Sequence, residues 1–205
     1  LDYSRAEEAK LRAENRLKNK ENILYTYVVP VLEIDGQKQD GTGYKIATNI
    51  DEINPRKIAK MGVDEALSKI NSKSIETGNY KIALYNEAMV SLLSAFCGVF
   101  SADATQKGLS LLKDKENTII ASENVTIVDN PLLENGLSSA PFDDEGVATF
   151  RKEIVSKGKL TTLLHNLKTA HKANTKSTGN GFKSSYASSV SVSPSNFYIE
   201  KGNLS

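Results

Sequence analysis

Cysteine is almost absent from this sequence, which has Cys97 alone, and tryptophan is missing altogether. A single cysteine excludes an internal disulfide framework and a cysteine-based zinc site, and it indicates a reducing compartment. Histidine is nearly as scarce, with only His165 and His171. Their separation differs from the three or four positions that bring two imidazoles to one helical face, so we expect no histidine metal site.

Excess charge of either sign is also missing, because the 205 residues carry a formal net charge of +1. This balance gives no general attraction to nucleic acid or to anionic lipid, so direct nucleic-acid binding is not expected. Long apolar runs are lacking too, and we find no signal peptide and no membrane span. We therefore expect a folded cytoplasmic protein.

The longest uncharged apolar stretch lies in NEAMVSLLSAFCGVF, from Asn86 to Phe100. It is too short to cross a bilayer and fits a buried helix. Asn86 is expected to cap the first turn, and Leu92, Leu93 and Phe96 are expected to be core residues. Cys97 lies within the same stretch and is interpreted as a small core residue, because apolar surroundings raise the pKa of a thiol.

The region before this stretch reads as a helix, a strand hairpin and a second helix. Apolar spacing predicts an amphipathic helix over Leu1–Lys20, and Asn54-Pro55 marks the start of another that continues to Ile70. Between them Ile23–Ile34 and Tyr44–Thr48 are expected to pair as strands around a polar turn, with Pro30 marking an edge or a bulge. The polar residues 72–79 are interpreted as a connection.

The second half of the chain mixes short strands with turn signals. The expected elements are a strand at Lys81–Tyr85, a structural acidic turn at Asp143-Asp144-Glu145, a hairpin around Ser156–Lys159, a helix over His165–Ala173 and a strand over Val190–Ile199. The sequence thus predicts a mixed α+β fold with largely antiparallel sheets and a buried central helix. The expected division is a partial two-domain architecture, with units 1–79 and 80–205.

Three separated stretches together resemble the PmbA/TldD family, whose members are described as modulators of DNA gyrase and are related to metalloproteases. They are Ala140–Gly146 (APFDDEG), the hairpin with its following helix over Lys152–Asn166, and Ser177–Gly181 (STGNG) with Ser185-Tyr186. The resemblance extends back through Leu84–Leu112 and, more loosely, over the first eighty residues. It implies that 1–79 belongs to the family's N-terminal domain and that 80–205 is an incomplete C-terminal domain.

The TldD branch of this family carries a helical HExxxH motif, in which two histidines bind zinc and the glutamate polarises water. The corresponding positions here are Ser94, Ala95 and Val99, none of which can perform those roles. This departure resembles the PmbA (TldE) branch, whose members pair with a TldD-type subunit and bind no catalytic zinc. The resemblance therefore implies no catalytic residues and no metal in this chain, with zinc expected only in a TldD-type partner.

Three functions remain open from the sequence. The first is a non-catalytic subunit of a TldD/PmbA-type intracellular metalloprotease complex that processes unfolded peptides, with a TldD-type catalytic subunit and a peptide substrate as partners. The alternative is a regulatory binding protein that modulates DNA gyrase or a toxin-antitoxin system without a protease role. An independent hydrolase is disfavoured, because the sequence has no GxSxG elbow or activated nucleophile constellation.

Overall fold

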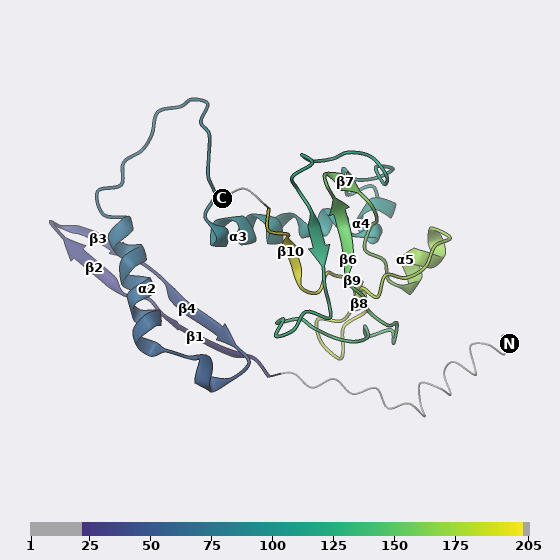
Figure 1. Cartoon of the computed structure of the whole chain (residues 1–205), viewed down its shortest axis with the longest axis horizontal. Helices are drawn as coiled ribbons and strands as arrows, with labels where there is room; N and C mark the ends of the chain where they lie inside the picture. Colours follow the sequence, from purple (N-terminus) through teal and green to yellow (C-terminus); the bar gives the residue numbers. More distant parts are fainter. Residues whose placement is uncertain (1–21, 203–205) are drawn as a thin grey trace. The chain divides into compact units, whose positions relative to one another are not determined.

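The structure, a computed structural model, describes residues 22–202, and these fall into two compact units that meet in the sequence at Ile82 and Ala83. The helix expected over Leu1–Lys20 lies outside the described residues. Helices and antiparallel sheets are mixed in the α+β manner that the sequence predicts (Figure 1).

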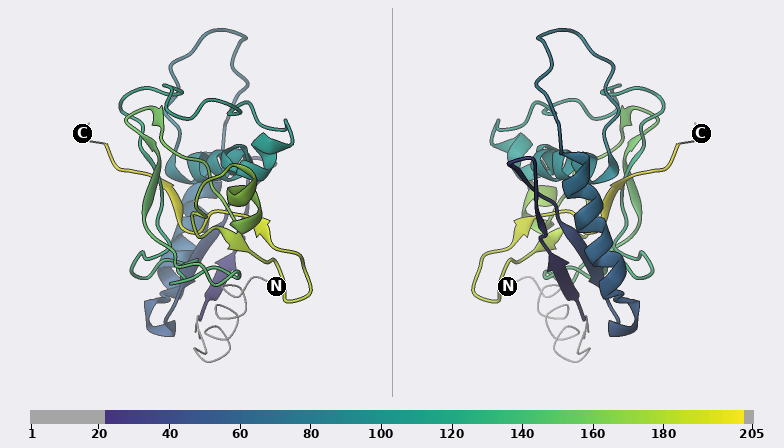
Figure 2. Two further views of the ribbon diagram at one scale, coloured as in Figure 1. Left: turned by 90° about the vertical axis from the view of Figure 1, so that its right-hand side faces the viewer. Right: turned by 90° about the vertical axis from the view of Figure 1, so that its left-hand side faces the viewer.

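The unit before Ala83 is a bent antiparallel ribbon with one long helix along it (Figure 2). Strand β1 pairs with β4, and β2 pairs with β3. The turn between β2 and β3 is Asp35-Gly36, both at positive φ, as a two-residue hairpin turn requires. The elements are β1 (Leu24–Val28), β2 (Val31–Ile34), β3 (Gln37–Asp40), β4 (Gly43–Ala47), the 3-10 helix η1 (Ile50–Glu52) and α2 (Pro55–Ser68).

Pro30 and two glycines determine how closely this ribbon and α2 approach each other. Pro30 separates β1 from β2, so the single strand expected there is in fact two. A Cβ on Gly43 would lie 1.8 Å from the Ile58 carbonyl oxygen of α2, and one on Gly62 would lie 2.7 Å from the Pro30 ring. Glycine at these positions therefore serves close packing of strand and helix.

The start of α2 follows the predicted capping chemistry. Asn54 is the N-cap, and its side chain accepts a hydrogen bond from the Lys57 amide, while Pro55 occupies the first helical position. Ile58 and Ala66 are buried on the face toward the ribbon. The predicted helix is confirmed.

The unit from Ala83 onward contains a four-stranded antiparallel sheet in the order β10-β5-β6-β7, with short helices and long loops around it (Figure 1). Ile154, Val155, Leu160 and Leu164 are fully or almost fully buried at its centre. Its elements are α3 (Asn86–Phe96), the 3-10 helix η2 (Cys97–Phe100), α4 (Ala102–Gln106), β5 (Ile127–Asp129), β6 (Lys152–Ser156), β7 (Lys159–Leu160), α5 (Leu167–Lys172), β8 (Gly181–Phe182), β9 (Ser191–Val192) and β10 (Phe197–Ile199).

The hairpin predicted around Ser156–Lys159 is confirmed. Lys157 and Gly158 both have positive φ between β6 and β7. Helix α5 is also present, with Asn166 as its N-cap. The strand expected over Val190–Ile199 is divided into β9 and β10 by an irregular segment that contains Pro194. The strand expected at Lys81–Tyr85 is wrong, since these residues form neither helix nor strand.

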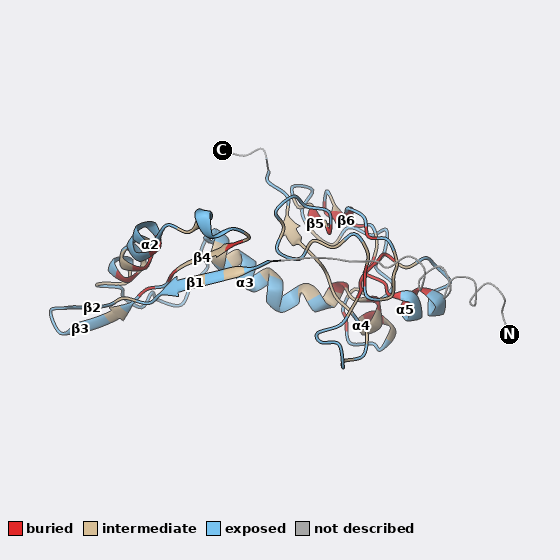
Figure 3. Cartoon of the chain, turned by 90° about the horizontal axis from the view of Figure 1, so that it is seen from below, coloured by how far each residue is buried: buried red, intermediate tan, exposed pale blue. Residues whose placement is uncertain are grey.

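The largest correction concerns α3, which is not the buried central helix that the sequence predicts. None of its residues is buried, and Figure 3 shows it entirely in the exposed and intermediate colours. Leu92 and Phe96 are 44% and 59% exposed, and only Leu93 packs against the core. Within this unit only one side of α3 packs against other residues. Its remaining apolar side chains are therefore left exposed or partly exposed. Asn86 is the first helical residue, and Tyr85 occupies the N-cap without a side-chain hydrogen bond.

Gly43→Ala should destabilise the unit formed by the ribbon and α2. The new methyl group would collide with the backbone of α2, which cannot move aside as a flexible side chain would. Overpacking of this kind costs about 1–3 kcal/mol. Thermal unfolding followed by circular dichroism should show a lowered midpoint. Gly98→Ala is the control, because a methyl group at that position would meet nothing within 4 Å; equal midpoints for both variants would contradict the packing argument.

Candidate functional site

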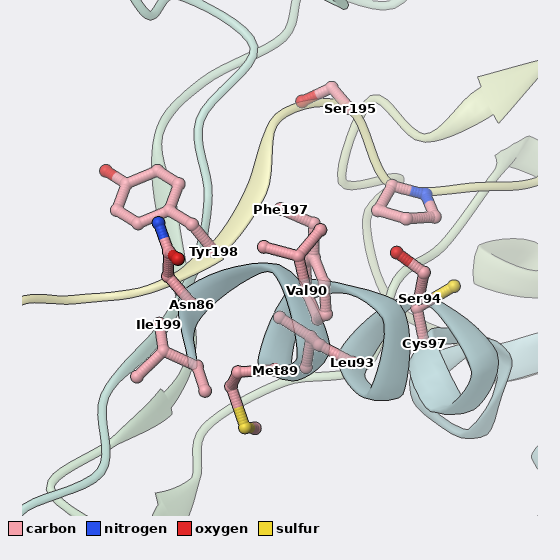
Figure 4. A pocket seen from close by; sticks show the side chains of 11 residues that line it. Asn86, Met89, Val90, Leu93, Ser94, Cys97, Ser195, Phe197, Tyr198 and Ile199 are labelled. Carbon is pink, nitrogen blue, oxygen red and sulfur yellow. The ribbon is translucent and has the colours of Figure 1, made fainter. Parts of the chain in front are cut away.

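A hollow in the second unit lies between α3 and the segment that includes β10, and we call it the α3 pocket. Its volume is about 370 Å³. Helix α3 and the first residue of η2 contribute residues at helical spacing, so they share one face (Figure 4). The lining residues are Asn86, Met89, Val90, Leu93, Ser94 and Cys97 from this side, and Pro194, Ser195, Phe197, Tyr198 and Ile199 from the other.

The α3 pocket has an apolar lining and no charged side chain among its lining residues. Leu93, Phe197 and Ile199 also pack against the hydrophobic core, so this wall of the pocket is anchored. Polar atoms come from Ser94, Ser195 and a few others at the margins. A dry cavity of about 150 Å³ already binds benzene. The α3 pocket is therefore large enough for an apolar side chain, and its lining offers no ionic partner for a charged group.

Three positions match the family's metal motif by the resemblance alone, and they lie near the end of α3 and in η2. Ser94 lines the α3 pocket, Ala95 is exposed, and Val99 lies beyond the end of α3 in η2, where it packs against the core. A hydroxyl, a methyl and an isopropyl group are not a zinc donor set. Within residues 22–202 no three His, Cys, Asp or Glu side chains gather as metal ligands would. Zinc therefore does not fit these residues.

Cys97 is half-buried at the end of this helical face rather than enclosed in the core. The two histidines differ in how far they are buried. His165 is buried just before α5, whereas His171 is exposed on that helix.

The acidic turn is hydrogen-bonded to Gly181 of the third stretch that carries the family resemblance, and to Leu167, the residue that follows the second stretch. Each carboxylate accepts a hydrogen bond from a distant backbone amide: Asp143 from Gly181 at 2.9 Å, Asp144 from Lys183 at 2.7 Å, and Glu145 from Leu167 at 2.7 Å. The acids therefore diverge toward separate donors, which is the structural turn that the sequence predicts. They tie the turn to the beginning of α5 and to β8.

A second polar cluster lies at the centre of the sheet, and sequence reasoning missed it. The Asp129 and Lys152 side chains are 0% and 4% exposed, and their Oδ2 and Nζ atoms lie 3.0 Å apart. Asn180 Nδ2 donates to the same Asp129 oxygen at 2.8 Å. The other carboxylate oxygen accepts from the backbone amide and the hydroxyl of Ser195. Asp129 thus holds Ser195, which lines the α3 pocket.

Burial acts on the protonation of Lys152 within this cluster. Desolvation lowers the pKa of Lys152, while the carboxylates of Asp129 and Asp143 act in the opposite direction. The Lys152 ammonium also lies 4.8 Å from the centre of the Phe150 ring. One signal of this cluster is present in the sequence, the STGNG stretch, in which Asn180 lies between two glycines. Lys152 gave no signal, because a charged residue usually lies on the surface.

Comparison with known proteins identifies the family. The family model described as the PmbA/TldA metallopeptidase C-terminal domain matches residues 77–205, and the chain therefore belongs to the PmbA/TldD metallopeptidase family. A metalloprotease PmbA homolog of Buchnera aphidicola subsp. Baizongia pistaciae is 31% identical over 147 residues, which are 71% of this chain and 33% of that protein.

Two solved structures share the fold. A candidate modulator of a DNA gyrase from Thermotoga maritima is 37% identical with a TM-score of 0.77, over 88% of this chain and 40% of that one. TldE from Thermococcus kodakarensis is 22% identical with a TM-score of 0.70, over 89% and 42%, which shows likeness of fold alone. The chain therefore spans less than half the length of these relatives.

Leu93→Ala and Phe96→Ala should differ in their effect on stability, although both truncate an apolar side chain on the same helix. Leu93 packs against the core, whereas Phe96 is 59% exposed. We expect the leucine variant to lose about 1–3 kcal/mol and the phenylalanine variant to lie within about 0.5 kcal/mol of the parent. Chemical unfolding measures both values. A larger loss for Phe96→Ala would contradict the exposed position of that side chain.

Stability should also decrease in mild acid because of His165. The side chain is 4% exposed, and Nδ1 has no hydrogen-bond partner among the described residues. Burial lowers the pKa of His165 from 6.5, against the opposing effects of Glu116 and a backbone hydrogen bond with Thr169. Below pH 6.5 the unfolded chain therefore binds a proton before the folded one does, and the free energy of unfolding falls until folded His165 also titrates.

Urea unfolding at a series of pH values between about 7 and 5 tests this expectation, because linkage relates the slope to the protons taken up on unfolding. His165→Gln should flatten the decrease, whereas His171→Gln, which changes an exposed position, should keep the wild-type profile. An unchanged slope in His165→Gln would show that another group is responsible.

Proposed function

We propose that this chain is a non-catalytic subunit of a TldD/PmbA-type intracellular metalloprotease complex that processes unfolded peptides. The observation that carries the proposal is the set of side chains on α3 and η2: Ser94, Ala95 and Val99 occupy the positions that the resemblance matches to the zinc ligands and the base. A hydrolytic zinc needs about three protein ligands and an open position for water. A TldD-type partner with an intact HExxxH motif would supply them.

The α3 pocket gives this subunit a way to act on the substrate. Its uncharged apolar lining suits an aliphatic or aromatic side chain, which an unfolded peptide exposes and a folded protein hides. Serine hydroxyls and an asparagine amide at its margins can pair with peptide groups. The chain would contribute part of the enclosure around the peptide, and the partner would perform the hydrolysis.

We further propose that the chain acts in the cytoplasm. A reducing environment would keep Cys97, the one cysteine of the chain, as a free thiol. Over residues 22–202 no helix has the length and apolarity that a bilayer span requires.

The alternative is a regulatory binding protein without a protease role. The similarity to the Thermotoga maritima structure, which is described as that of a candidate DNA gyrase modulator, supports this alternative. A toxin-antitoxin component would be another target of that kind. The two functions differ in whether peptide cleavage by a partner depends on this chain.

Peptide cleavage should require both proteins. The chain, a TldD-type family member with an intact HExxxH motif and the mixture of the two are each incubated with an unfolded, apolar-rich peptide. We expect cleavage only or mainly in the mixture. Cleavage by the partner that is unaffected by this chain, together with binding of the chain to DNA gyrase, would favour the regulatory alternative.

Val90→Asp locates the effect at the α3 pocket. Val90 lines the pocket and is 62% exposed, so a carboxylate there should leave the fold intact while opposing an apolar peptide side chain. We expect the mixture to cleave the peptide about tenfold less efficiently, since one lost apolar contact is worth about 1–3 kcal/mol. Leu111→Asp is the matched control, because Leu111 is 92% exposed and lies outside the pocket.

A further inference from the structure

The buried cluster of Asp129, Lys152 and Asn180 has a geometry that a simple ion pair does not require. The lysine amine and the asparagine amide both bind one carboxylate oxygen, Asp129 Oδ2, at 3.0 and 2.8 Å. All three residues are buried, with Asp129 and Asn180 at 0% exposure. An amine, an amide and a carboxylate are thus adjacent in a place that water does not reach.

We propose that Lys152 and Asn180 form an intramolecular isopeptide bond, with Asp129 as the proton carrier. Asp129 accepts a proton from the Lys152 ammonium, and the neutral Nζ then attacks Cγ of Asn180. The new Nζ–Cγ bond replaces the Cγ–Nδ2 bond. Asp129 passes this proton to the departing nitrogen and accepts the second Nζ proton as the amide forms, so the nitrogen leaves as neutral ammonia and Asp129 ends protonated. Atoms and charge then balance without an oxidant or another reactant.

Each group is arranged for its part in this reaction. Desolvation lowers the pKa of Lys152, which raises the fraction of neutral, nucleophilic amine. The Thr178 hydroxyl donates to the Asn180 carbonyl oxygen at 2.7 Å and would stabilise the negative charge that develops there. Ser195 fixes the other Asp129 oxygen through its amide and hydroxyl, so the carboxylate is oriented before the reaction.

The surroundings also disfavour a competing reaction at the same asparagine. An Asn-Gly pair can lose ammonia when the following backbone nitrogen attacks the side chain and closes a succinimide. The Gly181 amide, however, donates to Asp143 at 2.9 Å and is held by that hydrogen bond. Loss of ammonia at Asn180 is therefore directed to Lys152. The bond would join the beginning of β6 to the loop that precedes β8.

Mass spectrometry of the purified, denatured 205-residue chain tests the proposal. We expect an intact mass lower than that of the sequence by one ammonia molecule. Tryptic digestion should leave Lys152 uncleaved, and tandem spectra should identify one branched peptide that contains both Lys152 and Asn180. An intact mass equal to that of the sequence, with normal cleavage after Lys152, would overturn the proposal.

Variants separate the cross-link from succinimide formation at the Asn135-Gly136 pair, in which Asn135 is exposed. Lys152→Arg removes the nucleophile and retains the charge, so its mass should equal that of its own sequence. Asn135→Ala should keep the loss of ammonia seen in the parent. Loss of ammonia that persists in Lys152→Arg and disappears in Asn135→Ala would contradict the assignment. The parent's own branched peptide decides the matter if either variant fails to fold.

Discussion

The buried carboxylate of Asp129 is the constraint on which the second unit depends. Removing a carboxylate from water is costly unless charge and hydrogen bonds compensate it. Here Lys152, Asn180 and Ser195 compensate it, and they come from three other parts of the chain. Removing one partner of such a buried pair typically costs about 3–5 kcal/mol. The sheet, the loop before β8 and the approach to β10 are thus held at one point.

This constraint connects the core to the candidate site. Ser195 is bound to Asp129 and also lines the α3 pocket, and the neighbouring Phe197 packs against Phe100 with ring centres 5.6 Å apart. The wall opposite α3 is therefore fixed by the interior of the unit. The acidic turn adds a second set of ties, because its carboxylates hold backbone amides of α5 and β8. The three stretches that carry the family resemblance thus stabilise the fold of this unit, whereas the residues that line the α3 pocket lie outside those stretches.

Local chemistry made part of the fold predictable. Asn54-Pro55 specified the start of α2, and the Asp35-Gly36 and Lys157-Gly158 turns have the positive φ values that tight hairpins need. The missed features depend on what lies across space. The uncharged run of α3 predicted burial, but burial requires a surface to pack against, and only one side of the helix has one. Lys152 carried no sign of its burial because its partners are remote in sequence. The positions Ser94, Ala95 and Val99 were found only through the resemblance.

We propose that this member of the PmbA/TldD metallopeptidase family carries no catalytic metal of its own. Metal analysis of the purified chain, prepared with zinc in the medium and then dialysed, measures this directly. We expect well below one zinc per chain, because no imidazole or carboxylate stands at positions 94, 95 and 99. One tightly held zinc per chain, with peptide cleavage by the chain alone that a chelator abolishes, would contradict the claim.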